Sequence, residues 1–136
     1  MTASFQFDVR VYYEDTDAAG IVYYANYLRY MERARTEWLE TLGFPLAAFE
    51  REHGVTFAVR RASLDFLLPA RLNDRLAVSV EPQFTRGAQL DVVQRIARGD
   101  ALLVRGAISL ACIDLGRITP RRIPRPLLPH LPRRSA

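Results

Sequence analysis

The stretch YYEDTDAAGIVYYANYLRYMERARTEWLETLG, residues 12–43, decides the fold because it joins an acidic turn to a long amphipathic helix. Apolar side chains recur at helical spacing over residues 25–42, which predicts a helix there. Asn26 is the better candidate for its N-cap, with Ala25 as the alternative. Gly43 is suited to the position that follows a helix, and Pro45 prevents the helix from continuing. The apolar face of this helix carries Tyr27, Met31, Ala34 and Trp38.

Alternating patterns on either side of this stretch predict β-strands. Residues 5–13 alternate before the turn, and residues 46–53 are expected to form a second, shorter helix. The β-rich residues 55–68 change phase near Arg60 and Arg61, which indicates a bulge or a strong bend. Short connections make the remaining strands antiparallel neighbours. We expect these strands at residues 76–84, 90–96 and 102–113.

These elements predict an α+β fold in a single domain. One helix cannot cover both faces of a flat five-stranded sheet, but a strongly curved antiparallel sheet can wrap around it. The outer face and an open edge of the sheet then remain for solvent or for a partner. We expect the domain to span residues 1–122 and a loose tail, rich in proline and arginine, to follow at residues 123–136.

The composition limits the classes of function. A chain of 136 residues with 49% hydrophobic residues suits one globular domain. It has no apolar run of the ~18 residues that cross a bilayer, and its N-terminus lacks the pattern of a secretory signal. We therefore expect no integral membrane segment and a cytoplasmic location. Cys112 is the only cysteine, which excludes an intrachain disulfide, and it is expected to lie in the core.

The basic residues are all arginines and are unevenly distributed. Thirteen arginines and all 15 acids precede residue 117, whereas the other six arginines lie at residue 117 or beyond. A nucleic-acid-binding domain usually spreads its basic residues across one face of the fold, so nucleic acid is not an expected partner. The absence of lysine excludes Schiff-base catalysis and a P-loop lysine.

The acidic turn holds the best candidates for chemistry. A carboxylate beside the N–H groups at the start of a helix can attack a carbonyl group, or activate water against it. Asp15 is better explained as a structural residue, because an aspartate in a tight turn often bonds to its own backbone. Asp17 precedes three small residues and the apolar pair Ile21 and Val22, so we expect it beside a confined apolar pocket. Partial burial there would raise its pKa, and nearby amides would counter this rise.

Other chemistries fit the turn less well. An EF-hand loop beginning at Asp15 would need an oxygen ligand at Ala19 and a glutamate at Asn26. The chain has no G-x-S-x-G motif and too few ligands for zinc. His53 and His130 lie outside the turn and suit surface or capping roles. We therefore expect no metal and no other cofactor.

Two motifs resemble those of a known family. The turn YYEDTDAAGIVYYANY and the helix motif YMERARTEWLETLGF resemble the 4-hydroxybenzoyl-CoA thioesterase family. The closer likeness is to the acyl-CoA thioesterases found with the bacterial Tol–Pal envelope system. It is specific over the first third of the chain and looser beyond. The resemblance implies a hotdog fold, in which a curved five-stranded antiparallel sheet wraps one long helix. It also implies hydrolysis of a short-chain or aromatic acyl-CoA to the free acid and CoA.

The resemblance also implies roles for individual residues. Asp17 corresponds to the catalytic carboxylate, acting as nucleophile or as general base. The aromatic pair Tyr23 and Tyr24 corresponds to the helix start, and the backbone amide near Tyr24 would bind the oxyanion. Tyr24 stands where the envelope branch commonly has histidine, whereas a tyrosine is typical of the aromatic-CoA branch. Glu32 corresponds to an acid near the ring hydroxyl in that branch, although the ERAR that begins there is the envelope form. Contacts with substrate are expected from Ile21, Val22, Tyr23, Asn26 and Glu32.

The phosphates of CoA require cations, and arginines near strand ends can hold them. Arg86, Arg121 and Arg122 are our candidates, and Arg60 and Arg61 compete for the role. The open sheet edge favours pairing with a second copy of the chain. The resemblance implies active sites between the subunits of a homodimer or homotetramer.

Two alternatives of other classes remain open. The first is another hotdog enzyme of acyl thioesters, a hydratase or dehydratase, which usually needs a histidine together with an acid. The sequence has no histidine near Asp17. The second is a non-catalytic module that binds acyl carrier protein or an envelope partner through the arginine-rich tail.

Overall fold

The computed structural model describes residues 5–132. The strands are β1 (Phe5–Arg10), β2 (Val55–Phe66), β3 (Arg75–Arg86), β4 (Gln89–Arg98) and β5 (Ala101–Asp114). The α-helices are α1 (Asn26–Thr41) and α2 (Leu46–His53), and the 3-10 helices are η1 (Tyr13–Asp15) and η2 (Arg125–His130). Every strand and helix predicted from the sequence is therefore present.

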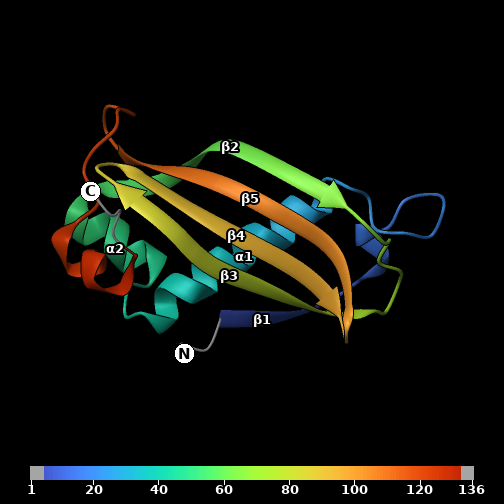
Figure 1. Ribbon diagram of the computed structural model, residues 1–136. Coiled ribbons are helices and arrows are strands. Elements are labelled where there is room, and N and C mark those ends of the chain that lie inside the picture. The colour runs from blue at the N-terminus through green and yellow to red at the C-terminus, as the bar shows by residue number, and fades with distance from the viewer. Residues whose placement is uncertain (1–4, 133–136) are drawn as a thin grey trace.

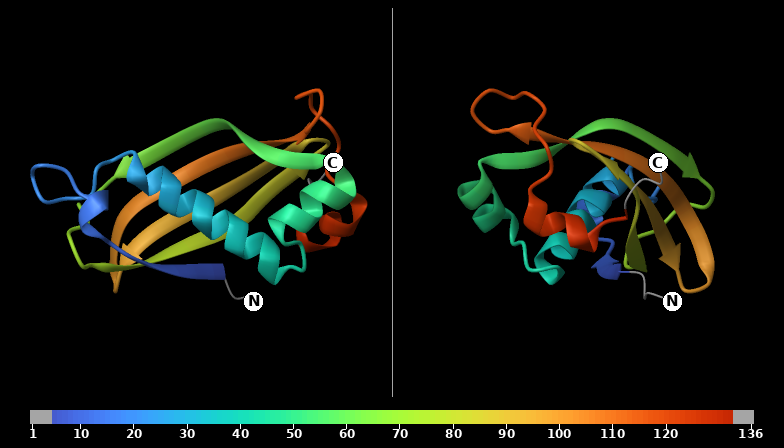
Figure 2. Two further views of the ribbon diagram at one scale, coloured as in Figure 1. Left: turned by 180° about the vertical axis from the view of Figure 1, so that it is seen from behind. Right: turned by 60° about the vertical axis from the view of Figure 1, so that its left-hand side comes forward.

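The five strands form one antiparallel sheet in the order β1-β3-β4-β5-β2 (Figure 1). The sheet curves around α1, and the turned views show α1 lying along its concave face (Figure 2). The phase change predicted near Arg60 is confirmed, because the pairing of β2 with β5 shifts between Val59 and Arg61. β1 and β2 form the two edges of the sheet. The predicted curved five-stranded sheet around one long helix is confirmed.

The core lies between α1 and the sheet. The apolar face of α1 is buried, with Met31 and Ala34 fully inaccessible to solvent. Gly106 on β5 allows this close approach, since a Cβ atom added there would lie 2.9 Å from the Met31 Cε atom. A glycine in a strand often marks such a close contact. The absence of a side chain at Gly106 therefore leaves room for the end of the Met31 side chain between α1 and β5.

The ends of α1 agree with the sequence to within one residue, but its N-cap does not. Ala25 holds the N-cap position and has no side-chain hydrogen bond, while Asn26 is the first helical residue. The Asn26 side chain is used elsewhere, as described below. Gly43 has a φ of +97°, which confirms the expected glycine after the helix.

The expectation of a loose C-terminal end is wrong for residues 123–132. Ile123, Leu127 and Leu131 are buried in the core, and the Thr85 hydroxyl donates to the carbonyl of Pro132. These three apolar residues recur every four positions and cover the end of the sheet beside η2. Residues 133–136 lie outside the described part of the chain.

Cys112 is fully buried, as predicted. Burial raises the pKa of its thiol to about 11, against a smaller lowering effect of Arg121. Within residues 5–132, neither α-helix is long and apolar enough to cross a membrane.

Candidate active site

The acidic turn is built around Asp15. Its carboxylate accepts a hydrogen bond from the Tyr12 amide at 2.9 Å. Its carbonyl oxygen accepts two more bonds, from the Tyr23 amide at 2.9 Å and from the Asn26 side-chain amide at 2.9 Å. The structural role predicted for Asp15 is thus confirmed. The backbone amide that its carboxylate binds, that of Tyr12, comes before it in the turn, whereas a partner two residues after it was expected. Asn26, expected as a cap and a substrate contact, instead ties the start of α1 to the turn.

Asp17 lies in the loop between the bridged residues Thr16 and Val22, and this loop projects beyond the end of the sheet (Figure 1). Its Oδ1 atom accepts a hydrogen bond from the Ala19 amide at 2.8 Å, and its own amide donates to the Ile21 carbonyl at 2.9 Å. Gly20, with a φ of +79°, closes the turn. The Asp17 side chain is exposed, so the apolar surroundings expected for it are not provided by one chain alone.

The start of α1 leaves few amides available for a ligand. The amides of Asn26, Tyr27 and Leu28 donate to the carbonyls three residues earlier. The Tyr23 amide is occupied by Asp15. Among residues 5–132, the Tyr24 amide has no acceptor. It is the one N–H group of the Tyr23–Tyr24 pair that can donate to a ligand, and it lies at the positive end of the helix dipole.

An aromatic surface borders this amide. The Tyr24 ring lies 4.9 Å from that of Tyr23 and 6.2 Å from that of Phe66. The Phe66 ring also lies 5.8 Å from that of Tyr27. Tyr24 and Phe66 are 62% and 54% exposed, which is unusual for large apolar side chains. A role for Phe66 in the site was not expected from the sequence. Its place at the start of α1 depends on the pairing of β2 with β5, which joins segments that are far apart in the chain.

Two neighbours of the turn are supporting residues. Val22 is buried, and its amide donates to the carbonyl of Ala70, so it anchors the turn in the core. Ile21 is half-buried and forms an isolated bridge with Arg71. Both were expected to contact substrate, but in one chain only Ile21 is partly accessible.

Tyr30 lies behind the turn and is 1% exposed. Its hydroxyl group has no hydrogen-bond partner among the described residues. Burial, and then the nearby Asp15 carboxylate, raise the pKa of this hydroxyl group well above its usual value.

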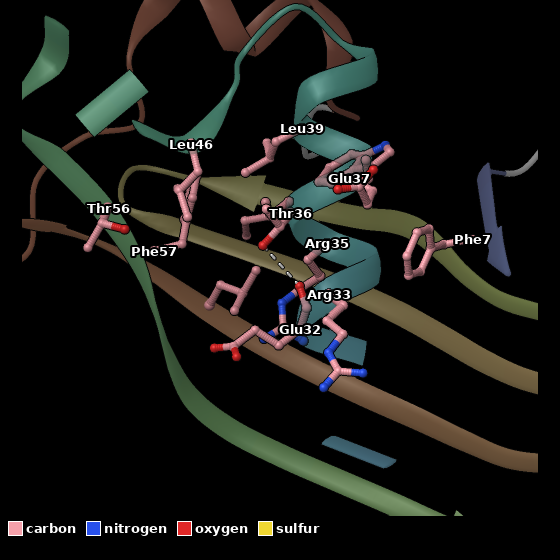
Figure 3. Close-up of a pocket in the computed structure, with 13 residues that line it drawn as sticks. Phe7, Glu32, Arg33, Arg35, Thr36, Glu37, Leu39, Leu46, Thr56 and Phe57 are labelled. Atoms are coloured by element: carbon pink, nitrogen blue, oxygen red, sulfur yellow. Dashed lines mark hydrogen bonds between the residues drawn. The ribbon is translucent and has the colours of Figure 1, made fainter. Parts of the chain in front are cut away.

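Glu32 lies farther along α1, away from Asp17. It lines a pocket of about 540 Å³ between α1, α2 and the sheet (Figure 3). Leu46 and Phe57 face α1 across this pocket. One chain therefore does not bring Glu32 and Asp17 to the same cavity.

The three arginines expected to hold CoA phosphates lie at the opposite end of the sheet. Arg86 ends β3, whose first residue, Arg75, pairs with Arg10 next to the acidic turn. A strand of this length spans roughly 36 Å. Arg121 forms an ion pair with Asp114 at 3.0 Å. Arg122 precedes Ile123, whose amide donates to the Gly87 carbonyl, so it lies at the same end.

Different arginines lie near the acidic turn. Arg71 is bridged to Ile21, and its side chain is exposed. Arg98 is less available, because it pairs with Asp74 at 2.6 Å. Arg10 donates to the Asn73 side chain. The pairing of β1 with β3 places these residues, so only a correct topology could have identified them from the sequence.

Neither histidine lies at the turn. The His53 ring packs against Phe49, and the His130 ring packs against Phe44, at the end of the sheet that carries α2 and η2. In the part of the chain that the structure describes, no three His, Cys, Asp or Glu side chains gather in a way that could hold a metal ion.

Comparison with known proteins agrees with this arrangement. Residues 11–131 match the family model of the thioesterase-like superfamily. The chain is 42% identical to the acyl-CoA thioesterase YbgC of Haemophilus influenzae over 121 residues, which are 89% of each chain. A probable thioesterase from Bartonella henselae has the same fold with a TM-score of 0.84 and 33% identity, over 90% of this chain and all of that one. A 1,4-dihydroxy-2-naphthoyl-CoA thioesterase from Synechocystis aligns with a TM-score of 0.82 and 26% identity, over 93% of each chain. The curved sheet around α1 is thus the hotdog fold expected from the resemblance, and the chain belongs to the thioesterase-like superfamily.

Proposed function

We propose that this protein hydrolyses acyl-CoA thioesters to a free acid and CoA. The likeness to the Haemophilus influenzae acyl-CoA thioesterase, over 89% of both chains, carries this proposal. The arrangement of the acidic turn supports it, since it combines an exposed carboxylate with an amide that lacks an acceptor in the described chain.

The Tyr24 amide binds the thioester carbonyl oxygen in this mechanism. Negative charge develops on that oxygen as the carbonyl carbon becomes tetrahedral, and the positive end of α1 stabilises it. Loss of one such donor typically costs about 2.7–4 kcal/mol of transition-state stabilisation. The hydrogen bonds of Asp15 to the segment from Tyr12 to Asn26 hold this amide in place.

Asp17 supplies the carboxylate. It either attacks the carbonyl carbon, giving a mixed anhydride that water then hydrolyses, or removes a proton from the attacking water. In both routes the C–S bond breaks, CoA leaves as the thiol and the acyl group gains a hydroxyl group from water. The bond from the Ala19 amide fixes one carboxylate oxygen and leaves the other for chemistry.

A second copy of the chain completes this site. Asp17 is exposed in one chain, and a carboxylate in bulk water lacks the low-dielectric surroundings that make such sites effective. The β1 and β2 edges are unpaired in one chain and are available for contact with a second copy. A homodimer or a homotetramer that covers the turn would confine the substrate there.

The aromatic surface of Tyr23, Tyr24 and Phe66 favours a short-chain or aromatic acyl group, because flat rings pack well against exposed rings. Among the arginines at this end, Arg71 has an exposed side chain that is able to reach a CoA phosphate. The distance along β3 makes Arg86 available only to a site built by another subunit.

Release of free thiol from a panel of short-chain, long-chain and aromatic acyl-CoAs tests the proposal. Asp17→Asn keeps the oxygen that accepts from Ala19 but removes the charge, so we expect turnover to fall to below a tenth of the wild-type rate. Glu14→Gln is the matched control, because it removes an exposed acid of the same turn. A wild-type protein inactive on the whole panel, or an Asp17→Asn variant that keeps more than a tenth of the rate, would contradict the proposal.

A further inference from the structure

The pocket between α1, α2 and the sheet contains an arginine that has no acidic partner. Most of its wall is apolar, from Trp38, Leu39, Phe57, Leu90 and Leu110. Its volume of about 540 Å³ lies within the range of small-molecule sites, roughly 300–1,000 Å³. Arg35 contributes a positive charge to this wall.

Arg35 reaches under α1 toward the sheet. Its Nη1 atom donates to the Gln94 side-chain oxygen at 2.9 Å. Gln94 is fully buried, and its amide group donates to the carbonyls of Met31 at 3.0 Å and Ser79 at 3.3 Å. The position of the Arg35 guanidinium is therefore fixed by a buried side chain that is itself fully bonded.

The charge of Arg35 is poorly compensated. Burial lowers the pKa of its guanidinium, and only the nearby Glu32 opposes this effect. Among residues 5–132, no carboxylate lies within 4 Å of the guanidinium. Glu32, Glu37 and Arg33 also line the pocket, but their side chains are exposed to water, which screens their charges.

A guanidinium carries five N–H donors in one plane, and such a group matches a carboxylate with two parallel hydrogen bonds. A partly buried cation usually has such a partner, because a charge without one is costly in an apolar setting. An amphipathic anion would satisfy both the apolar wall and Arg35. A phosphate monoester or a nucleotide would not, since the wall offers no second cation at the same depth.

We propose that this pocket binds the carboxylate of a medium-chain organic acid, with Arg35 as its partner and the hydrocarbon chain against the apolar wall. The carboxylate has two possible sources, a free fatty acid or the distal carboxyl group of a dicarboxylic acyl chain. The second source rests on the proposed thioesterase function, whereas the first does not.

Binding of decanoate, measured by calorimetry with the full chain, tests the site without any turnover. We expect decanoate to bind at least tenfold more tightly than decanol. Arg35→Gln should abolish this preference, because it removes the guanidinium charge; its shorter side chain also loses the bond to Gln94, so the thermal stability of the variant is measured alongside. Arg29→Gln is the matched control, since it removes an exposed charge on α1 that does not line the pocket, and it should change the affinity less than twofold.

A second arm identifies the source of the carboxylate. It compares kcat/KM for a ten-carbon dicarboxylic monoacyl-CoA with that for decanoyl-CoA in the wild type and in Arg35→Gln. A loss of at least tenfold confined to the dicarboxylic substrate assigns the pocket to the distal carboxyl group. An unchanged ratio together with lost decanoate binding assigns it to the free acid.

Equal binding of decanoate and decanol, or decanoate binding that survives Arg35→Gln in a protein of wild-type thermal stability, would overturn the proposal. Arg35→Lys provides a further check, because it keeps the charge and should retain part of the preference. Since the binding arm requires no hydrolysis, failure of the thioesterase proposal would leave its result interpretable.

Discussion

Substitution of Asn26 separates a hydrogen bond from simple packing at the start of α1. Asn26 is 9% exposed, and its side-chain amide donates to the Asp15 carbonyl at 2.9 Å. In Asn26→Ala this carbonyl keeps its bond from the Tyr23 amide, so the loss is one hydrogen bond of about 0.5–1.5 kcal/mol. We expect the free energy of unfolding to fall by about 1 kcal/mol.

Asn26→Asp should cost more at pH 7, although an acid in the first turn of a helix normally gains about 0.3–1 kcal/mol from the dipole. The new carboxylate would face the Asp15 carbonyl in a buried site without a donor, and this costs about 1–3 kcal/mol. The unfavourable effect is larger, so we expect a net loss of about 2 kcal/mol. Burial would also raise the pKa of the new carboxyl group above its unfolded value.

The pH dependence of Asn26→Asp follows from this sign. A group with a raised folded pKa stabilises the fold below its unfolded pKa and loses that stabilisation as the pH rises through the folded pKa. The protonated group donates to the Asp15 carbonyl, so the difference between Asn26→Asp and Asn26→Ala should shrink as the pH falls below 5. Urea unfolding at a series of pH values measures this difference in the free energy of unfolding between the two variants. An Asn26→Asp variant as stable as the wild type at pH 7 would refute the reasoning.

Three further changes probe other parts of the fold. Tyr30→Phe removes a buried hydroxyl group without a partner, so we expect the free energy of unfolding to change by less than about 0.5 kcal/mol, or to rise; a loss above 1.5 kcal/mol in urea unfolding would reveal a bond to Asp15. Gly106→Ala places a Cβ atom 2.9 Å from Met31 Cε, the flexible end of that side chain, so Met31 has to shift within the core and we expect a loss of about 1 kcal/mol, at the lower end for overpacking, which Met31→Leu in the same chain should partly relieve; an unchanged thermal midpoint would contradict it. Burial tends to raise the pKa of Asp74, but the Arg71 amide and the Arg98 guanidinium hold this pKa below its usual value. The ionised Asp74 side chain therefore stabilises the fold above its unfolded pKa, and this stabilisation is lost as the pH falls through the folded pKa. Asp74→Asn should therefore flatten the acid side of the stability curve, whereas a parallel curve would show that the pair does not contribute.

The sequence predicts the elements well because their patterns are local. The alternation of β1, the apolar face of α1 and the phase change near Arg60 all arise between residues close in the chain. Asp15 was identified as structural for the same reason, since its main partners lie in the same turn.

The features that the sequence could not predict depend on pairing between distant segments. The Tyr23 amide donates to the Asp15 carbonyl and is therefore not available to a ligand. The Phe66 ring lies beside that of Tyr24 because the sheet places the end of β2 at the start of α1. The distance of Arg86 from the turn was available in principle from the length of its strand, once the pairing of β1 with β3 was known. Proline and arginine make up half of residues 123–136, and this composition masked an apolar residue at every fourth position from Ile123 to Leu131.

The buried segment that includes η2 has a consequence for biosynthesis. A ribosome makes all five strands before it makes Leu127 and Leu131, which cover the end of the sheet beside the β3–β4 turn. A nascent chain whose sheet has folded thus exposes the apolar end of that sheet until these leucines pack against it. During that interval a chaperone would bind the exposed apolar surface, and incompletely folded chains would be most prone to aggregate.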